Sequence, residues 1–411
     1  MLRSHHKTIF EILGRHPIHP FPARMAPGIA LEALGESKKP LRVLDPMAGS
    51  GTVLAVARAN GHRACGVDLD PLAVLLAGVW TRSIDAADVT DKAEEVLSRA
   101  RARMKTWPVS QAYPPESDEE TRSFIRYWFD SYVRRQLAAL ALSIKRTHDL
   151  AIREALWCGF SRLIITKQAG ASLALDLSHS RPHKKFERAP IKPFGRFLSA
   201  VDLVVSNCPQ KNSGTVGPAA IARQGDARNL EIADSSIDLV LTSPPYLNAI
   251  DYLRCSKFSL VWMGHTVREL RQIRARSVGT EASAQLALDT EWVQTILRQL
   301  RIKPALSTRD HALLSTYAWD MGHAMAEVLR VLKRGGRAVY VVGDSTIRGT
   351  FIRNSAIVAA VASRAGLSIA SRQARNLPAN RRYLPPPARG ADKVMLNGRM
   401  RREVVVEFTK P

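Results

Sequence analysis

A glycine-rich loop near residue 50 has the composition of a ligand-binding turn. It follows a short apolar run and precedes a segment rich in Ala and Leu. The loop reads Asp45-Pro46-Met47-Ala48-Gly49-Ser50-Gly51-Thr52. Glycine allows a tight turn and a close approach of the backbone to a ligand, and a helix that starts there offers unpaired N–H groups. A turn that only serves packing is the alternative, and the loop alone leaves both open.

A second carboxylate indicates which ligand would suit this loop. Asp68 ends the next apolar run, and an acid at that strand end can accept hydrogen bonds from both ribose hydroxyls. The loop lacks the Lys of a phosphate-binding P-loop, and Asp45 would repel a pyrophosphate. A nucleoside that carries an amine and no phosphate fits better. The residues therefore favour S-adenosylmethionine over NAD or ATP.

A second candidate site follows another buried apolar run, Ile237–Leu241. It reads Thr242-Ser243-Pro244-Pro245-Tyr246. Two prolines stiffen the chain and remove backbone donors, so acceptors without an obvious strand partner, the Ser243 hydroxyl and the Ser243 and Pro244 carbonyls, would face a cleft beside the Tyr246 ring. Acceptors and a flat ring suit a planar base that carries an amino group. A turn that only ends the strand is the equally weighted alternative.

The elements that must position these residues have α/β character. Residues 41–79 read as strand, glycine-rich turn, helix, strand, acid and helix, which is the opening of a doubly wound sheet. The pattern resumes at 237–246, with a helix predicted over 325–332, ended by Gly335-Gly336, and a strand over 337–342. We divide the chain into residues 1–81, a mainly helical insertion at 82–222, and residues 223–411; an independent middle domain is the alternative.

Together the two motifs resemble the S-adenosylmethionine-dependent amino-methyltransferases of DNA, which make N4-methylcytosine or N6-methyladenine. Asp45 to Thr52 is similar to that family's cofactor loop, D-P-F-x-G-x-G-T, with Met47 in place of Phe. Ser243 to Tyr246 is similar to its catalytic tetrapeptide. The S-P-P-Y form is most similar to the N4-cytosine branch, whereas the N6-adenine branch more often has D-P-P-Y. The resemblance implies a Rossmann-like methyltransferase sheet.

The resemblance also implies roles for single residues. Phe21 lies in a segment, 16–27, that is similar to the one closing over the methionine part of the cofactor, and Asp226 is similar to the acid that meets the adenine amino group. The implied cofactor-binding residues are Phe21, Asp45, Pro46, Ala48, Gly49, Ser50, Gly51, Thr52, Asp68 and Asp226. The implied catalytic residues are Ser243, Pro244, Pro245 and Tyr246. If the insertion recognises the target, the order of motifs is similar to the family's α-type arrangement.

The implied chemistry is direct methyl transfer to a flipped base. The Ser243 and Pro244 acceptors would bind the amino protons as the amine becomes pyramidal, and Tyr246 would stack on the base. A cysteine nucleophile would instead mark methylation at cytosine C5. Cys208 precedes Pro209 where that chemistry has Pro before Cys, so we predict an ordinary loop residue.

Charge and composition limit the partners and the compartment. The chain of 411 residues carries a formal net charge of +23, which favours a polyanion such as double-stranded DNA; an arginine-rich host proteome is the other explanation. An RNA methyltransferase and a non-enzymatic nucleic-acid-binding protein remain alternatives. The sequence contains no run of 18 apolar residues, so we predict no membrane span. The first residues also lack the apolar core of a signal peptide. We expect a cytoplasmic, nucleoid-associated protein, with a cognate restriction endonuclease that forms no stable complex.

Two further sets of residues have alternative interpretations. The four cysteines form no C-x-x-C pair and the histidines show no ligand spacing, so we predict no metal. Arg271, Arg274 and Arg276 could contact phosphates or lie on a solvated helix face. Tyr127-Trp128-Phe129 is more typical of a helix core than of a base-stacking platform. The sequence leaves the DNA target and the oligomeric state open.

Overall fold

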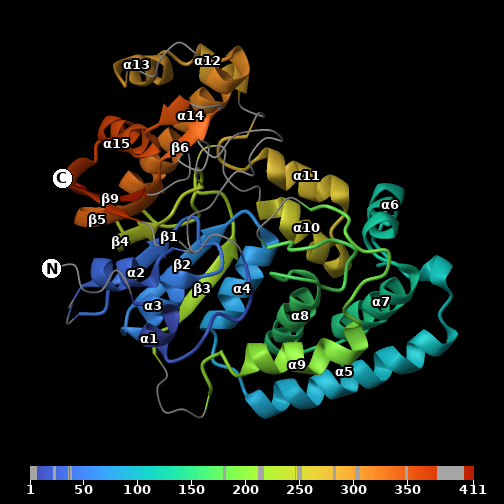
Figure 1. Ribbon diagram of the computed structural model, residues 1–411. Helices are drawn as coiled ribbons and strands as arrows, with labels where there is room; N and C mark the ends of the chain where they lie inside the picture. Colours follow the sequence, from blue (N-terminus) through green and yellow to red (C-terminus); the bar gives the residue numbers. More distant parts are fainter. Residues whose placement is uncertain are drawn as a thin grey trace. The chain divides into compact units, whose positions relative to one another are not determined.

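The computed structural model describes most of the chain in two compact units, which are treated separately below (Figure 1). The described residues are 7–21, 25–35, 37, 39–178, 182–211, 217–245, 247, 252–280, 284–300, 306–347, 350–376 and 402–411. Unit 1 comprises residues 1–32, 48–224 and 251–274, and unit 2 comprises residues 33–47, 225–250 and 275–411.

Seven strands form one mostly parallel sheet in the order β3-β2-β1-β4-β5-β9-β8. In unit 1, β2 (Arg63–Asp68) pairs in parallel with β3 (Ala220–Gln224). In unit 2, β1 (Arg42–Asp45), β4 (Ile237–Thr242) and β5 (Leu332–Gly343) are parallel neighbours. The last strands, β8 (Ser368–Asn376) and β9 (Arg402–Thr409), add antiparallel pairs. The predicted α/β fold class is confirmed.

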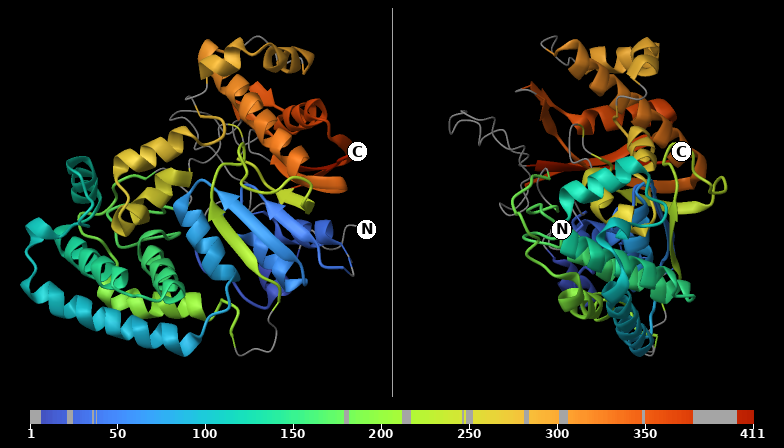
Figure 2. Two further views of the ribbon diagram at one scale, coloured as in Figure 1. Left: turned by 180° about the vertical axis from the view of Figure 1, so that it is seen from behind. Right: turned by 90° about the vertical axis from the view of Figure 1, so that its right-hand side faces the viewer.

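Most helices of unit 1 lie in one group. Contacts join α5 to α7 and α9, and α8 to α9, and both views of Figure 2 show these helices packed together. The helices are α1 (Ile9–Leu13), α2 (Pro27–Leu34), α3 (Thr52–Ala59), α4 (Pro71–Thr81), α5 (Ala86–Thr106), α6 (Glu119–Trp128), α7 (Ser131–Lys145), α8 (Leu150–Ile164), α9 (Pro193–Val205), α10 (Tyr252–Met263) and α11 (Val267–Ala275). A short 3₁₀ helix spans Val109–Gln111. The segment between β2 and β3 is therefore helical, as predicted.

Aspartate caps explain where many of these helices begin. An aspartate side chain accepts a hydrogen bond from a first-turn N–H in five helices, at Asp70, Asp85, Asp118, Asp130 and Asp149. Such a cap satisfies a donor that the helix leaves unpaired and contributes about 1 kcal/mol. Behind the caps, large rings fill a common core, among them Trp80, Phe129, Phe160, Phe197, Phe258 and Trp262.

In unit 2, the predicted helix end at Gly335-Gly336 is wrong. Its helices are α12 (Ala284–Asp289), α13 (Glu291–Gln299), α14 (Thr308–Val331) and α15 (Asn354–Ala365), and a short hairpin joins β6 (Ser345–Ile347) to β7 (Thr350–Ile352). Helix α14 ends at Val331, and the chain enters β5 at once. Gly335 and Gly336 therefore lie inside a strand and do not end the helix as predicted.

The glycines instead shape an irregularity in β5. The register with β4 jumps from Ile237–Leu332 to Leu239–Arg337, and Gly335 has a φ of +72°. The Gly335 N–H donates to the Lys410 carbonyl, and the Lys410 N–H donates to the Gly336 carbonyl. A bulged strand and a helix C-terminus both favour glycine at positive φ, so the sequence signal was ambiguous.

No described helix combines the length and the apolar character needed to cross a membrane.

Candidate cofactor and catalytic site

The glycine-rich loop forms a turn that other residues would strain. Gly49 and Gly51 have φ values of +50° and +84°. The turn is closed by a hydrogen bond from the Gly51 N–H to the Ala48 carbonyl, and the Ala48 N–H donates to the Val67 carbonyl at the end of β2. A Cβ atom at Gly51 would lie 2.8 Å from both Cα and Cβ of Ala77 in α4. The loop therefore passes so close to α4 that only glycine fits.

Asp68, which the sequence analysis paired with this loop, lies against it; its role toward a ribose stays a prediction. Its Oδ2 accepts the Gly49 N–H at 2.8 Å, and its Oδ1 accepts the Asp70 N–H at 2.9 Å. Burial raises the pKa of Asp68 above its ordinary value, although these backbone hydrogen bonds act in the opposite direction. Among the described residues, the main chain orients this carboxylate and no cation pairs with it, and a carboxylate oxygen can accept more than one hydrogen bond.

Phe21 meets the same loop from the segment that precedes α2. A Cβ atom at Gly49 would lie 3.9 Å from Phe21 Cε1, and the Phe21 side chain is buried. The segment is anchored to α8, because Arg162 donates to the Ile18 carbonyl and His19 Nε2 lies 2.9 Å from Ser161 Oγ. The structure therefore brings Phe21, the loop and Asp68 together within unit 1.

Asp70 and Ser256 form a buried pair that the sequence analysis did not assign. Asp70 caps α4 through the Leu72 N–H, and its Oδ2 accepts the Ser256 hydroxyl of α10 at 2.5 Å. Burial raises the pKa of Asp70 to about 7, with a smaller contribution in the same direction from Asp68. Ser256 lies 186 residues from Asp70 in the sequence, so no local signal pointed to this pair.

In unit 2, Asp45 joins the first candidate motif to the second. Its Oδ1 accepts the Thr242 hydroxyl at 2.6 Å and the Met47 N–H at 3.1 Å. Asp45 and Thr242 end the parallel neighbours β1 and β4. Pro46 lies in the turn that follows β1. Open α/β sheets bind ligands outside the carboxyl ends of their strands, so the two motifs meet where such a sheet places its chemistry.

Residues 243–245 leave the sheet directly after Thr242. The Ser243 hydroxyl donates to the Val341 carbonyl of β5 at 3.1 Å, so the expectation that it lacks a strand partner is wrong. Pro244 is buried and Pro245 is partly exposed. Tyr246 lies outside the described residues, and its predicted place beside the acceptors stays a prediction.

Asp226 belongs to a network of charged side chains in unit 2. Arg228 donates from Nε to Asp226 Oδ1 at 2.9 Å and from Nη2 to Asp226 Oδ2 at 2.7 Å. The same guanidinium reaches Asp320 Oδ1 at 2.5 Å, and the Gly279 N–H donates to the other Asp320 oxygen. Burial alone would raise the pKa of Asp226, but the hydrogen bonds and charge of Arg228 outweigh it and lower the pKa.

Sequence reasoning named Asp226 but not the residues that hold it. Arg228 and Asp320 are 92 residues apart, so no spacing could reveal their contact. The role of Asp226 toward an adenine amino group stays a prediction.

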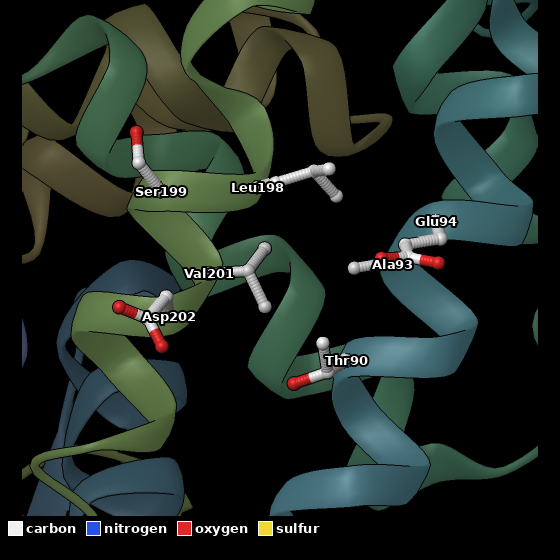
Figure 3. A pocket seen from close by; sticks show the side chains of 7 residues that line it. All are labelled: Thr90, Ala93, Glu94, Leu198, Ser199, Val201 and Asp202. Atoms are coloured by element: carbon white, nitrogen blue, oxygen red, sulfur yellow. The ribbon is translucent and has the colours of Figure 1, made fainter.

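A cavity in unit 1 is lined by residues other than the predicted site residues. It lies between α5 and α9, with Thr90 and Glu94 on one side and Leu198 and Asp202 on the other (Figure 3). None of the predicted site residues lines it. We therefore do not assign it to the candidate site.

Two Type II methyltransferases are similar to this chain at low sequence identity. No model of a protein family matches the chain. The chain is 23% identical over 381 residues to Type II methyltransferase M.AvaI of Nostoc sp., with 81% of this chain and 74% of that protein covered. It is 21% identical over 369 residues to Type II methyltransferase M.MvaI of Kocuria varians, with 84% and 80% covered.

Solved structures of methyltransferases also align with the chain, at still lower sequence identity. A TehB-like SAM-dependent methyltransferase from Corynebacterium glutamicum aligns with 93% of this chain and 87% of its own, at 11% identity. Its TM-score of 0.29 is too low to support a conclusion. What the comparisons establish is similarity to Type II methyltransferases over most of the chain.

Proposed function

We propose that the protein is a DNA methyltransferase that transfers a methyl group from S-adenosylmethionine to the N4 amine of cytosine. The observation that carries the proposal is the Asp45–Thr242 hydrogen bond, because it joins the cofactor motif and the catalytic motif at the ends of neighbouring strands. The similarity to Type II methyltransferases supports methyl transfer. The net charge of +23 supports a polyanionic substrate.

The described residues fit S-adenosylmethionine as the cofactor. Asp68, oriented by two backbone N–H groups, suits the ribose hydroxyls, and the turn from Ala48 to Thr52 lets the backbone approach the ligand. Phe21 packs against that turn, and Asp45 supplies an acid for the amine of the methionine part. When bound, the cofactor supplies an electrophilic methyl group on its sulfonium.

The protein's own contribution to the transfer is the placement of hydrogen-bond acceptors. The lone pair of an exocyclic amine is conjugated with the ring, so the flat amine is a poor nucleophile. The Ser243 and Pro244 acceptors bind the amino protons more strongly as the nitrogen becomes pyramidal, which stabilises the transition state more than the ground state. Tyr246 would stack on the flipped base and hold its amine in position for direct transfer.

Ser243 is the feature that favours cytosine over adenine. The S-P-P-Y form is most similar to the N4-cytosine branch of the resembled family. The same acceptors also suit adenine N6 or an amine in RNA, which are the alternative substrates.

The proposal extends to the rest of the chain and its setting. Residues 82–222 would contain the target-recognition region. A cognate restriction endonuclease and a nucleoid location belong to the same proposal. The substrate polymer is tested by comparing methyl transfer to duplex DNA and to RNA.

The catalytic assignment is tested by single-turnover methyl transfer to a cognate duplex. Pro244→Ala loosens the backbone that aims the carbonyl, so we expect a lower kcat with a nearly unchanged KM, as for an interaction made mainly in the transition state. Tyr246→Ala removes base stacking, worth about 1–3 kcal/mol, and should weaken productive DNA binding.

Tyr246→Phe is the matched control, because it keeps the ring and should cost little. Equal inactivity of Tyr246→Phe and Tyr246→Ala would show that the hydroxyl matters and that stacking is the wrong account. A full kcat for Pro244→Ala would reduce the tetrapeptide to a structural turn.

A further inference from the structure

Two exposed tyrosines of the helical region each lie under a lysine. Tyr127 of α6 is 56% exposed and Tyr132 of α7 is 50% exposed. Lys184 Nζ lies 5.2 Å from the centre of the Tyr127 ring, and Lys192 Nζ lies 5.5 Å from that of Tyr132. The prediction that residues 127–129 form a helix core therefore fails for Tyr127, while Phe129, just after the end of α6, is buried in the core. Lys184 and Lys192 are exposed as well, so both Lys–Tyr pairs face solvent.

The segment that carries the lysines is fixed to the helices by hydrogen bonds. The Lys185 N–H donates to the Leu173 carbonyl at 2.8 Å. Asp130 caps α7 with one oxygen, and its other oxygen accepts the Ala189 N–H at 2.7 Å. Lys192 Nζ also donates to the Ala189 carbonyl. The positions of the two lysines are thus set by the fold.

The same segment carries an excess of positive charge. Residues 182–196 contain five cations, Lys184, Lys185, Arg188, Lys192 and Arg196, against the single acid Glu187, which gives 5 − 1 = +4. On α6, Glu119 pairs with Arg126, and Glu120 pairs with Arg271 of α11. Within the described part of the chain, neither Lys184 nor Lys192 forms an ion pair.

We infer that the two Lys–Tyr pairs, Lys184–Tyr127 and Lys192–Tyr132, bind the phosphates of the DNA substrate. The inference rests on the proposed function and assigns the surface that holds the duplex. Each ring keeps its ammonium group in place through a cation–π contact, and the ammonium and the tyrosine hydroxyl are both donors that suit phosphate oxygens. Such contacts fix the position of the duplex and carry no sequence information.

The test is the salt dependence of DNA binding by the full chain. Each phosphate contact adds about 0.9 to the log–log slope of affinity against salt. Lys184→Gln with Lys192→Gln should therefore lower the slope by about 1.8 and weaken binding by roughly one to two orders of magnitude near 0.1 M salt. The loss should be equal for target and non-target duplexes, as measured by fluorescence anisotropy.

Matched variants separate this surface from net charge. Lys39→Gln with Lys92→Gln removes the same charge from an exposed residue of unit 2 and from a lysine paired with Glu95 on α5, and it should leave the slope nearly unchanged. Lys184→Arg with Lys192→Arg should restore it. An unchanged slope in the Lys184/Lys192 glutamine variant, with wild-type thermal stability, would overturn the inference, as would an equal loss in both glutamine variants.

Failure of the proposed function has a different signature. In that case the wild-type chain transfers no methyl group to DNA, whatever the salt dependence of DNA binding in the variants. If the inference alone is wrong, the wild-type chain methylates DNA and the Lys184/Lys192 variant does so with the same affinity and slope.

Discussion

Two carboxylates that follow neighbouring parallel strands are held in opposite ways. Asp68 ends β2, and main-chain N–H groups of Gly49 and Asp70 orient it. Asp226 lies two residues after β3, and the guanidinium of Arg228 binds both of its oxygens. The pKa of Asp68 lies above its ordinary value and that of Asp226 below. The first acid is therefore oriented by the main chain at a cost of burial, whereas the charge of the second already stabilises the fold.

The largest effect expected from this difference concerns Arg228. Arg228→Met leaves Asp226 and the buried Asp320 without their shared cation, and breaking such a buried pair costs about 3–5 kcal/mol. Urea unfolding measures the change. The control is Arg126→Met, which removes an exposed pair with Glu119 and should leave the urea midpoint nearly unchanged. Equal losses would mean that the Arg228 network does not stabilise unit 2.

The glycine loop beside Asp68 provides the next test. Gly51→Ala adds a Cβ at 2.8 Å from Ala77, so we expect a loss of about 1–3 kcal/mol from overpacking beyond the cost of the positive φ. Gly61→Ala isolates that backbone cost, because Gly61 has a φ of +80° and no atom within 4 Å of the added Cβ. If the two variants unfold at the same urea concentration, the close approach to α4 has no energetic weight.

The proposed ligand role of Asp68 predicts an effect on binding and not on stability. Asp68→Ala should weaken S-adenosylmethionine binding by about 1–3 kcal/mol, the value of hydrogen bonds to a charged group. Isothermal calorimetry on the variant and on the wild-type chain gives the difference. An unchanged affinity would remove the ribose assignment, and Asp70 would become the next candidate.

The pH dependence of stability tests the buried Asp70. In the unfolded chain its carboxyl ionises near its ordinary value, whereas in the folded chain it keeps its proton to about pH 7. The folded state therefore binds more protons in that window, and the free energy of unfolding falls as pH rises from about 4 to about 7. Asp70→Asn should flatten this fall, measured as urea midpoints at several pH values. An identical pH profile in the variant would show that Asp70 is ionised in the fold.

What the sequence could predict was local. The order of strand, glycine turn, helix and acid over residues 41–79 reflects short-range periodicity and turn chemistry, and β1, α3, β2 and α4 follow it closely. The Asp45–Thr242 contact could be predicted from the sequence only because both residues follow predicted strands, and a parallel sheet brings the ends of its strands together.

What the sequence could not predict depends on long-range packing. The Asp70–Ser256 and Arg228–Asp320 contacts join residues 186 and 92 positions apart. Tyr127 was assigned to a core by composition, although α6 turns that residue toward solvent and buries Ile125. Gly335 was predicted to end a helix but lies in a strand at positive φ, because a helix end and a bulge both favour glycine in that conformation.

The central claim is methyl transfer to a DNA amine, and the identity of the methylated nucleoside tests it most directly. Purified protein is incubated with duplex DNA and S-adenosylmethionine carrying a labelled methyl group, and the DNA is digested to nucleosides and analysed by mass spectrometry. The account predicts the label in N4-methylcytosine and a strongly reduced yield with Pro244→Ala. Label in 5-methylcytosine, or label found in RNA and absent from DNA, would contradict it.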